Sequence, residues 1–316
     1  MGLHTLGNSG LEIGPLVFGG NVFGWTIDEP TSFRLLDAFV DAGFNTIDTA
    51  DMYSTWVPGH KGGESETIIG KWLKATGKRH KVLIATKVGM DLGPGKKGLS
   101  KQYILRAAED SLQRLQTDHI DLYQSHTDDK ETPLAETLGA YQQLIESGKV
   151  RAIGASNYSA ERLEEALQTS KEHGLPRYEC LQPCYNLLER EEYESGPETI
   201  CTQNALGVIP YFPLASGFLT GKYRSEDDLT KSPRGQGIKK YLNDRGFKIL
   251  SALDEVAKRY NSNPARIALA WVAARPSITA PIASATSLEQ FDDLVEATKL
   301  RLDESSIELL NQASSK

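Results

Sequence analysis

Four side chains that can donate, accept or orient a proton follow three neighbouring apolar runs of the sequence. Asp48 ends one run and Tyr53 follows it, Lys87 comes directly after the next run, and His126 follows the third. A tyrosine hydroxyl has a reference pKa of about 10, and a nearby ammonium group lowers that pKa toward neutral. Asp48 could hold Lys87 in place, and His126 could hydrogen-bond a substrate carbonyl oxygen. Each residue alone has an ordinary structural explanation, but their joint placement indicates acid–base chemistry at an oxygen atom.

Polar side chains after the next apolar runs suit a flat ligand that carries a carboxamide. Ser156 and Asn157 follow the fifth run, and Gln182 ends the sixth. Hydroxyl and amide side chains match a primary carboxamide, which donates two hydrogens and accepts at its oxygen. Tyr211 ends the seventh run, and its ring could stack on a flat heterocycle.

The segments after the last two runs could bind phosphate groups. Small residues allow close backbone approach, and a helix N-terminus suits an anion. We expect cofactor contacts from Phe212, Pro213, Leu214, Gly217, Lys222, Arg224, Ser284, Thr286 and Gln290. Trp25 and Trp56 fall in loops near the same end of the molecule and could line a substrate pocket.

These residues require a scaffold that brings many strand ends together. The sequence predicts strands at residues 15–18, 46–48, 81–86, 120–123, 150–153, 179–182, 208–211 and 279–282. Amphipathic stretches between them predict helices at residues 31–42, 65–75, 100–115, 133–147, 159–172, 247–260 and 264–274. Such alternation indicates parallel βαβ units, and eight of them close naturally into an α/β fold, the (β/α)₈ TIM barrel.

Two additions to the barrel are predicted. Residues 3–13 resemble a β-hairpin around Asn8-Ser9-Gly10 that plugs the bottom of the barrel. The long interval after the seventh strand holds a Gly/Pro/Lys-rich loop at 216–243 and extra helical structure. No composition shift marks a linker, so residues 1–316 are expected to form a single barrel domain. The alternative is an open doubly wound sheet, but no Gly-x-Gly-x-x-Gly follows an early strand.

Composition excludes several classes of protein. The chain has 35 Lys and Arg against 42 Asp and Glu, a net charge of −7, which argues against nucleic acid or an anionic membrane surface as a partner. No apolar window approaches the roughly 20 residues that span a bilayer. Three cysteines without metal-ligand spacing predict no metal site. Together with an N-terminus that lacks a signal-peptide pattern, they predict a cytoplasmic protein.

As a set, these motifs resemble those of the aldo-keto reductases over nearly the whole chain. The motifs are Asp48-Thr-Ala-Asp-x-Tyr53, Gly62-Gly-Glu-Ser-Glu66, Ala85-Thr-Lys87, Asp121-Leu-Tyr-Gln-Ser-His126, Gly148-Lys-Val-Arg-Ala-Ile-Gly-Ala-Ser-Asn157, Gln182-Pro-Cys-Tyr-Asn186 and Tyr211-Phe-Pro-Leu214. The resemblance implies a (β/α)₈ barrel that binds NADP(H) without a Rossmann domain.

The resemblance also implies a role for each site residue. Tyr53 would be the general acid/base, Asp48 and Lys87 would tune it, and His126 would orient the substrate. The nicotinamide carboxamide would be held by Ser156, Asn157 and Gln182, with Tyr211 stacked on the ring. The implied activity is reduction of aldehydes or ketones to alcohols, or the reverse oxidation of an alcohol or sugar.

One segment departs from the family pattern. Ser284-Ala-Thr286 stands where the family usually has Gly-Ala-Ser/Arg, and Leu294 stands near a position that is often an adenine-contacting Asn. No Arg in this segment could clamp a 2′-phosphate, so NAD(H) remains an alternative cofactor.

Three alternative functions follow from the same residues. One is an NAD-dependent sugar or alcohol dehydrogenase, and another is a cofactor-binding regulatory subunit resembling potassium-channel β subunits. A barrel hydrolase would need paired carboxylates or metal ligands at the strand ends, which the sequence does not show. The sequence does not determine the substrate among carbonyls, alcohols and sugars, the direction of the reaction or the oligomeric state.

Overall fold

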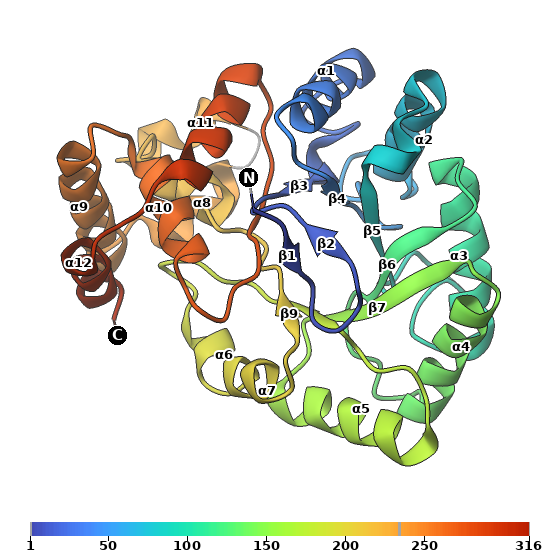
Figure 1. The fold of residues 1–316 in the computed structure, drawn as a ribbon. Helices are drawn as coiled ribbons and strands as arrows, with labels where there is room; N and C mark the ends of the chain where they lie inside the picture. The colour runs from blue at the N-terminus through green and yellow to red at the C-terminus, as the bar shows by residue number, and fades with distance from the viewer. Residues whose placement is uncertain (1, 233–234, 316) are drawn as a thin grey trace.

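Eight short parallel strands form one sheet in a computed structural model that describes residues 2–232 and 235–315 (Figure 1). The strands, in spatial order, are β10 (Ile282–Ala283), β3 (Val17–Gly19), β4 (Thr46–Asp48), β5 (Leu83–Val88), β6 (Ile120–Ser125), β7 (Val150–Ser156), β8 (Cys180–Gln182) and β9 (Gly207–Val208). Backbone hydrogen bonds from Thr279 N to Val208 O (2.8 Å) and from Ile282 N to Pro210 O (2.9 Å) join the two ends of this order. The sheet therefore curls round on itself, which confirms the predicted (β/α)₈ barrel.

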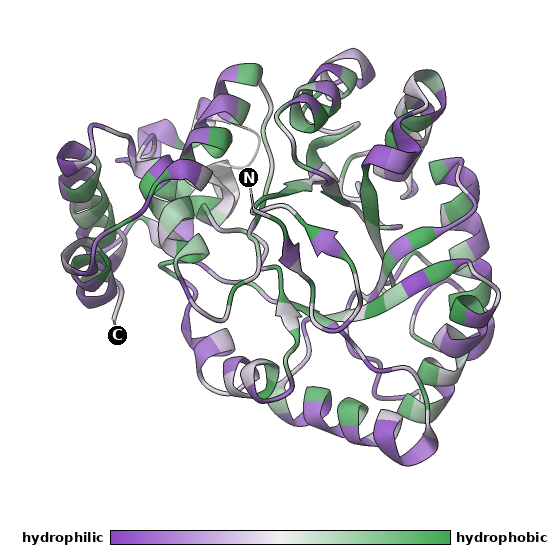
Figure 2. Cartoon of the chain, viewed as in Figure 1, coloured by the Kyte–Doolittle hydropathy of each residue, from purple (hydrophilic) through white to green (hydrophobic). Residues whose placement is uncertain are grey.

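Amphipathic helices surround the sheet, with their apolar faces turned toward it (Figures 1 and 2). Five follow successive strands: α1 (Glu29–Asp41), α2 (Glu64–Thr76), α3 (Lys101–Leu115), α4 (Leu134–Glu146) and α5 (Ala160–His173). Their ends follow local chemistry. The Ser159 side chain accepts a hydrogen bond from Arg162 N at the start of α5, and Gly77 ends α2 with φ of 65°, a conformation that glycine adopts without strain.

The predicted N-terminal hairpin closes one end of the barrel. Strands β1 (His4–Thr5) and β2 (Glu12–Ile13) pair antiparallel. Gly7 between them has φ of 57°, and a Cβ there would lie 2.2 Å from Glu179 O, so only glycine fits. Leu6, Leu11 and Ile13 pack with apolar side chains that point into the barrel. The hairpin thus plugs the end at which the strands begin, as predicted.

Extra helical structure follows the seventh strand, as predicted. It comprises η3 (Ala215–Thr220), η4 (Glu226–Lys231), α8 (Gly235–Ile238), η5 (Lys239–Tyr241), α9 (Asp244–Arg259) and α10 (Pro264–Ala273). Residues 233 and 234 of the predicted loop 216–243 lie outside the described part of the chain. After β10 come α11 (Leu288–Lys299) and α12 (Glu304–Ser314), and α12 packs against α9 at the edge of the barrel (Figure 1).

Several boundaries differ from the sequence prediction. β5, β6 and β7 run beyond their predicted ends, so Lys87 and Ser156 lie inside strands. The seventh strand ends at Val208 because Pro210 has no N–H for the ladder, and Tyr211 forms only an isolated bridge with Cys184. Two helices between β8 and β9 were not predicted, α6 (Glu191–Glu194) and α7 (Pro197–Gln203).

Candidate active site

A buried lysine joins an aspartate and a tyrosine where the strands end. Lys87 Nζ donates hydrogen bonds to Asp48 Oδ2 (2.7 Å), to the backbone oxygen of Thr49 (2.8 Å) and to Tyr53 OH (3.1 Å). An ammonium group has three donors, and these contacts use all of them. The Lys87 side chain is 0% exposed, so the ion pair with Asp48 is shielded from solvent. The structure therefore places Tyr53 OH against a fixed positive charge.

Two glutamines hold the far side of the same carboxylate. Asp48 Oδ1 accepts from Gln182 Nε2 at 2.8 Å and from Gln124 Nε2 at 3.4 Å, and Gln182 Nε2 also approaches Gln124 Oε1 at 3.2 Å. Gln182 thus points into the barrel toward Asp48, and its amide nitrogen is already used there. Sequence reasoning missed Gln124, although a polar residue within a buried strand is itself a signal of a hydrogen-bonded core site.

Burial dominates the proton affinity of the tyrosine. The Tyr53 side chain is half-buried, and its hydroxyl lies 3.1 Å from the buried Lys87 ammonium. Burial raises the pKa of Tyr53, and the Lys87 ammonium offsets only part of this effect, so the pKa stays above its usual value. The sequence prediction of a lowered pKa was wrong because it counted the ammonium and not the burial. Tyr53 therefore keeps its proton at neutral pH.

The same balance gives the opposite result for the lysine. Burial lowers the pKa of Lys87, but the charges and hydrogen bonds of Asp48 and Tyr53 outweigh burial, and the pKa lies above its usual value. Lys87 is therefore an ammonium in the folded protein.

His126 lies beside the tyrosine as a neutral imidazole. The ring centroids of Tyr53 and His126 are 6.0 Å apart. Burial, with the Lys87 charge as a second cause, holds the pKa of His126 well below its usual value. Its Nδ1 atom is buried without a hydrogen-bond partner. A neutral imidazole offers one N–H, which can donate to an oxygen placed beside Tyr53.

The two tryptophans predicted to line a substrate pocket lie next to this tyrosine. The Trp56 ring packs edge-on against Tyr53 with centroids 5.7 Å apart, and Trp25 packs edge-on against Trp56 at 5.4 Å. Trp56 is 43% exposed, which is high for so large an apolar side chain. The three rings therefore form a row in which the exposed Trp56 lies between Trp25 and Tyr53.

The residues predicted to contact a carboxamide lie close together at the ends of the next strands. Ser156 Oγ donates to Gln182 O (2.9 Å), and Asn157 Nδ2 contacts Ser156 Oγ (3.1 Å) and His126 O (2.9 Å). Tyr211 OH donates to Asn157 Oδ1 at 2.8 Å. The predicted residues are thus brought together, and the Asn157 amide hydrogen-bonds protein groups at both ends.

The segment after Tyr211 has an unusual backbone and an exposed lysine, Lys222. Phe212, Ser216 and Gly217 have φ of 58°, 57° and 99°. Phe212 is exposed, Pro213 is buried and Leu214 is half-buried. A Cβ on Gly217 would lie 3.6 Å from Lys222 Nζ, so the exposed ammonium lies over this glycine.

Arg224 is held away from this segment. Its NH2 group pairs with Asp254 at 2.8 Å, and its Nε donates to Gly221 O at 2.8 Å. The sequence grouped Lys222 with Arg224 as cations for phosphate, whereas the structure commits the arginine to α9.

The last predicted segment packs on the first strand. Ser284 Oγ lies 2.7 Å from both Gly19 O and Asn21 Oδ1. A Cβ on Gly19 would come within 2.5 Å of that hydroxyl, which explains the glycine. Sequence reasoning missed Asn21, whose signal was its place after Gly19-Gly20 at the end of the first strand. Gln290 Oε1 accepts from Thr286 N and Oγ1 at the start of α11.

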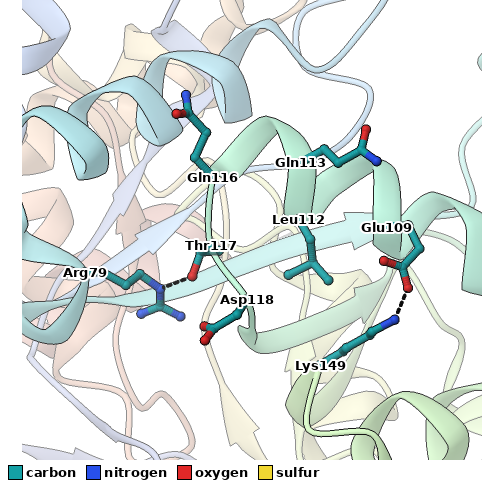
Figure 3. Close-up of a pocket in the computed structure, with 8 residues that line it drawn as sticks. All are labelled: Arg79, Glu109, Leu112, Gln113, Gln116, Thr117, Asp118 and Lys149. Atoms are coloured by element: carbon teal, nitrogen blue, oxygen red, sulfur yellow. Dashed lines mark hydrogen bonds and ion pairs between the residues drawn. The ribbon is translucent and has the colours of Figure 1, made fainter.

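A separate surface hollow lies where the strands begin (Figure 3). Its lining comes from the segments before β5, β6 and β7 and from α3: Arg79, Glu109, Leu112, Gln113, Gln116, Thr117, Asp118 and Lys149. Arg79 Nε donates to Thr117 Oγ1 at 2.8 Å, and Lys149 pairs with Glu109. Since Lys87 and Tyr53 lie at the opposite strand ends, this hollow does not belong to the cluster above.

Comparison of the sequence with known protein families agrees with this architecture. The model of the aldo/keto reductase family matches residues 15–315. The chain belongs to the aldo/keto reductase family. As a member, this aldo/keto reductase is an oxidoreductase of a family that reduces carbonyl compounds with nicotinamide cofactors. Within the described residues, no helix has the length and apolar character needed to traverse a bilayer.

Three relatives extend over most of the chain. This aldo/keto reductase is 38% identical to the uncharacterized oxidoreductase YrpG of Bacillus subtilis, over 97% of this chain and 94% of the relative. It is 34% identical to the aldo-keto reductase YhdN of the same organism, over 93% and 88%. It is 31% identical to the aldo-keto reductase yakc [NADP(+)] of Schizosaccharomyces pombe, over 90% and 83%.

Proposed function

We propose that this protein is an NADP(H)-dependent oxidoreductase that reduces aldehydes or ketones to alcohols, with Tyr53 as the proton donor. The observation that carries the proposal is the contact of 3.1 Å between Tyr53 OH and the buried Lys87 ammonium. The reverse oxidation of an alcohol or sugar would use the same groups, because proton transfer at Tyr53 is reversible.

Each side chain of the cluster has one task in carbonyl reduction. Tyr53 is protonated at neutral pH and can donate its proton to the carbonyl oxygen. Lys87 stabilises the phenolate that remains, and Asp48 fixes the ammonium in place. Neutral His126 can donate a hydrogen bond to the same carbonyl oxygen and orient it. The nicotinamide cofactor, when bound, supplies the hydride.

The residues around this cluster fit a nicotinamide cofactor. Ser156 and Asn157 offer a hydroxyl and an amide beside His126, and the Tyr211 ring offers a flat face next to them. Asn157 would have to exchange its contact with Tyr211 for the carboxamide. The left-handed backbone at Phe212, Ser216 and Gly217 fits close approach of a ligand, and the glycine leaves room.

Lys222 is our candidate for the group that favours NADP(H) over NAD(H). Its ammonium lies over Gly217, while the charge of Arg224 is already paired with Asp254. Ser284 and the start of α11 at Thr286 and Gln290 supply the remaining polar contacts. A relative named for NADP(+) supports the same choice.

The remaining predictions stay proposals. We propose that residues 1–316 form one barrel domain that acts on small-molecule substrates, and that Trp25 and Trp56 contact the substrate. Free thiols at Cys180, Cys184 and Cys201 support a reducing compartment such as the cytoplasm.

Steady-state assays with the purified protein test the proposal. We expect NADPH oxidation with simple aldehydes or ketones, and tighter binding of NADP⁺ than of NAD⁺ in calorimetric titrations. Absence of turnover with every carbonyl, alcohol and sugar, in the presence of tight cofactor binding, would favour a regulatory subunit. Equal or tighter binding of NAD⁺ would overturn the cofactor assignment and favour an NAD-dependent dehydrogenase.

A further inference from the structure

Asp51 is a buried carboxyl group of the reaction centre for which the mechanism above has no use. It lies two residues before Tyr53, and its N–H donates to Lys87 O at 3.3 Å. The residue is 2% exposed, and among the described residues both of its carboxyl oxygens are buried without a hydrogen-bond partner of normal geometry. Buried polar groups in native proteins are almost always hydrogen-bonded, so this one requires an explanation.

The neighbouring charges are already paired with one another. Lys87 is paired with Asp48 at 2.7 Å. Arg114 Nε on α3 is paired with Glu66 Oε2 on α2 at 2.6 Å, and Thr86 Oγ1 donates to the other oxygen of Glu66. The two cations are thus matched by two carboxylates, and Asp51 is the third carboxyl group. An ionised Asp51 would be an uncompensated buried charge, which is costly, so the neutral acid is favoured.

Charged and titratable side chains on several surrounding elements interact electrostatically with Asp51. They are Tyr53 after β4, Glu66 on α2, Lys87 on β5, Tyr103 and Arg114 on α3, Tyr123 on β6 and Tyr141 on α4. Burial and the charge of Glu66 raise the pKa of Asp51 to about 8, with Arg114, the backbone N–H of Met52 and Lys87 acting in the opposite direction. The carboxylate in turn raises the pKa of Tyr53.

We propose that Asp51 is a positioning residue for proton transfer: a buried carboxyl group, two residues before Tyr53, that is kept neutral and whose ionisation makes Tyr53 a weaker proton donor. The neutral acid leaves the full field of the Lys87 ammonium available to the phenolate that forms at Tyr53. The carboxylate adds a negative charge there and cancels part of that field. This inference rests on the proposed role of Tyr53 as the proton donor.

The direction of the pH dependence follows from these charges. When pH rises and Asp51 loses its proton, the phenolate product of proton donation is less stabilised, so carbonyl reduction slows. Alcohol oxidation starts from the phenolate, so its rising limb moves to higher pH. Both effects reach the substrate only through Tyr53, and cofactor binding should not change with Asp51.

The test compares the pH dependence of kcat for carbonyl reduction in the wild type and in Asp51→Asn. Both profiles should coincide below about pH 6, where Asp51 is neutral in the wild type. Above that pH, the wild-type rate should fall by roughly tenfold through the ionisation of Asp51, a size fitting one charge acting within the protein interior. The Asn variant should lack this fall. Asp227→Asn, at an exposed position in η4, is the matched control and should keep it.

An Asn variant that retains the wild-type alkaline limb would overturn the inference. Should the Asn variant not fold, infrared titration of the wild type decides the same question. A protonated carboxyl band present at pH 7 and lost through pH 8 to 9 supports the inference, and its absence at pH 7 overturns it. Full activity of Tyr53→Phe would instead overturn the proposed function, and the infrared result would remain separate from it.

Discussion

Two buried aspartates, Asp121 and Asp48, lie at opposite ends of the barrel, and they differ in whether the polar groups around them are all hydrogen-bonded. Where the strands begin, Asp121 accepts from Arg79 NH2 (2.7 Å), Arg151 NH1 (2.7 Å) and Ile84 N (2.8 Å). The side chains of Arg79 and Arg151 are 20% and 48% exposed, so solvent shares in their stabilisation. These contacts connect β5, β6 and β7, and each of them is made between groups of the protein.

Where the strands end, Asp48 lies in a cluster with unused hydrogen-bonding capacity. Its partner Lys87 is 0% exposed and donates to the hydroxyl of Tyr53, whose ring packs against Trp56. His126 Nδ1 and both oxygens of Asp51 are buried without partners. A buried ion pair is therefore not by itself a mark of function. Unpaired polar atoms beside such a pair are the stronger signal, because a structural network normally satisfies its own members.

Replacement of Lys87 should have the largest effect on both stability and activity. A small effect would contradict the difference drawn between the two ends of the barrel. Lys87→Met leaves Asp48 as an uncompensated buried charge, which costs about 3–5 kcal/mol of unfolding free energy. It also removes the ammonium that stabilises the Tyr53 phenolate, so kcat should fall by at least about a hundredfold. Denaturant unfolding and steady-state kinetics on the same variant measure both losses.

Asp121→Asn is the matched change at the other end of the barrel. It should lower the free energy of unfolding by about 1–3 kcal/mol, because its arginine partners are partly solvated. The kcat of this variant should stay within twofold or so of the wild type, far from the effect of losing a catalytic group. A large loss of kcat in Asp121→Asn, at retained stability, would contradict the division between the two ends.

The pH dependence of stability should sharpen the contrast through His126. The folded state holds the pKa of His126 well below its usual value, so the unfolded chain binds this proton more readily. Stability is therefore full above the unfolded pKa of about 6.5 and is lost as pH falls below it, by up to about 1.4 kcal/mol per pH unit.

His126→Asn should remove this contribution to the slope, whereas His173→Asn, exposed at the end of α5, should retain it. Unfolding free energies measured from pH 7 to pH 5 give the comparison. Identical slopes in the wild type and His126→Asn would show that the imidazole does not stay neutral.

The smallest expected effect is on NADP⁺ affinity, and it distinguishes the roles of Lys222 and Arg224. Lys222→Gln should weaken NADP⁺ binding by roughly tenfold, the size of one charge-assisted contact. Arg224→Gln should change it by less than twofold or so, because Asp254 and Gly221 O already engage the guanidinium. Calorimetric titration measures both, and the reverse order of effects would transfer the phosphate contact to Arg224.

Much of the fold could be predicted because each strand is a short apolar run and each helix begins or ends with recognisable chemistry. The polar residues that follow those runs meet at one end, since the carboxyl ends of parallel strands share a face of the barrel. Helices α6 and α7 escaped prediction because four and seven residues are too few to show an apolar periodicity.

The site was harder to predict where distant partners or burial decide the outcome. The engagement of Arg224 depends on Asp254, thirty positions away, and Gln124, directly after the predicted strand 120–123, reaches Asp48 from 76 positions away. The proton affinity of Tyr53 depends on how deeply its hydroxyl lies, which no local pattern reveals. Residue types and order therefore predicted which side chains meet, but not the balance of charge among them.

The most direct test of the central claim is the rate of a single turnover in Tyr53→Phe. This change removes one hydroxyl and keeps the ring that packs against Trp56 and His126. We expect the reduction rate to fall by about 10²–10⁴-fold, the usual contribution of a general acid, with the affinity for NADP⁺ and the free energy of unfolding nearly unchanged. A rate within about threefold of the wild type, well short of that contribution, would contradict the assignment of Tyr53 as the proton donor.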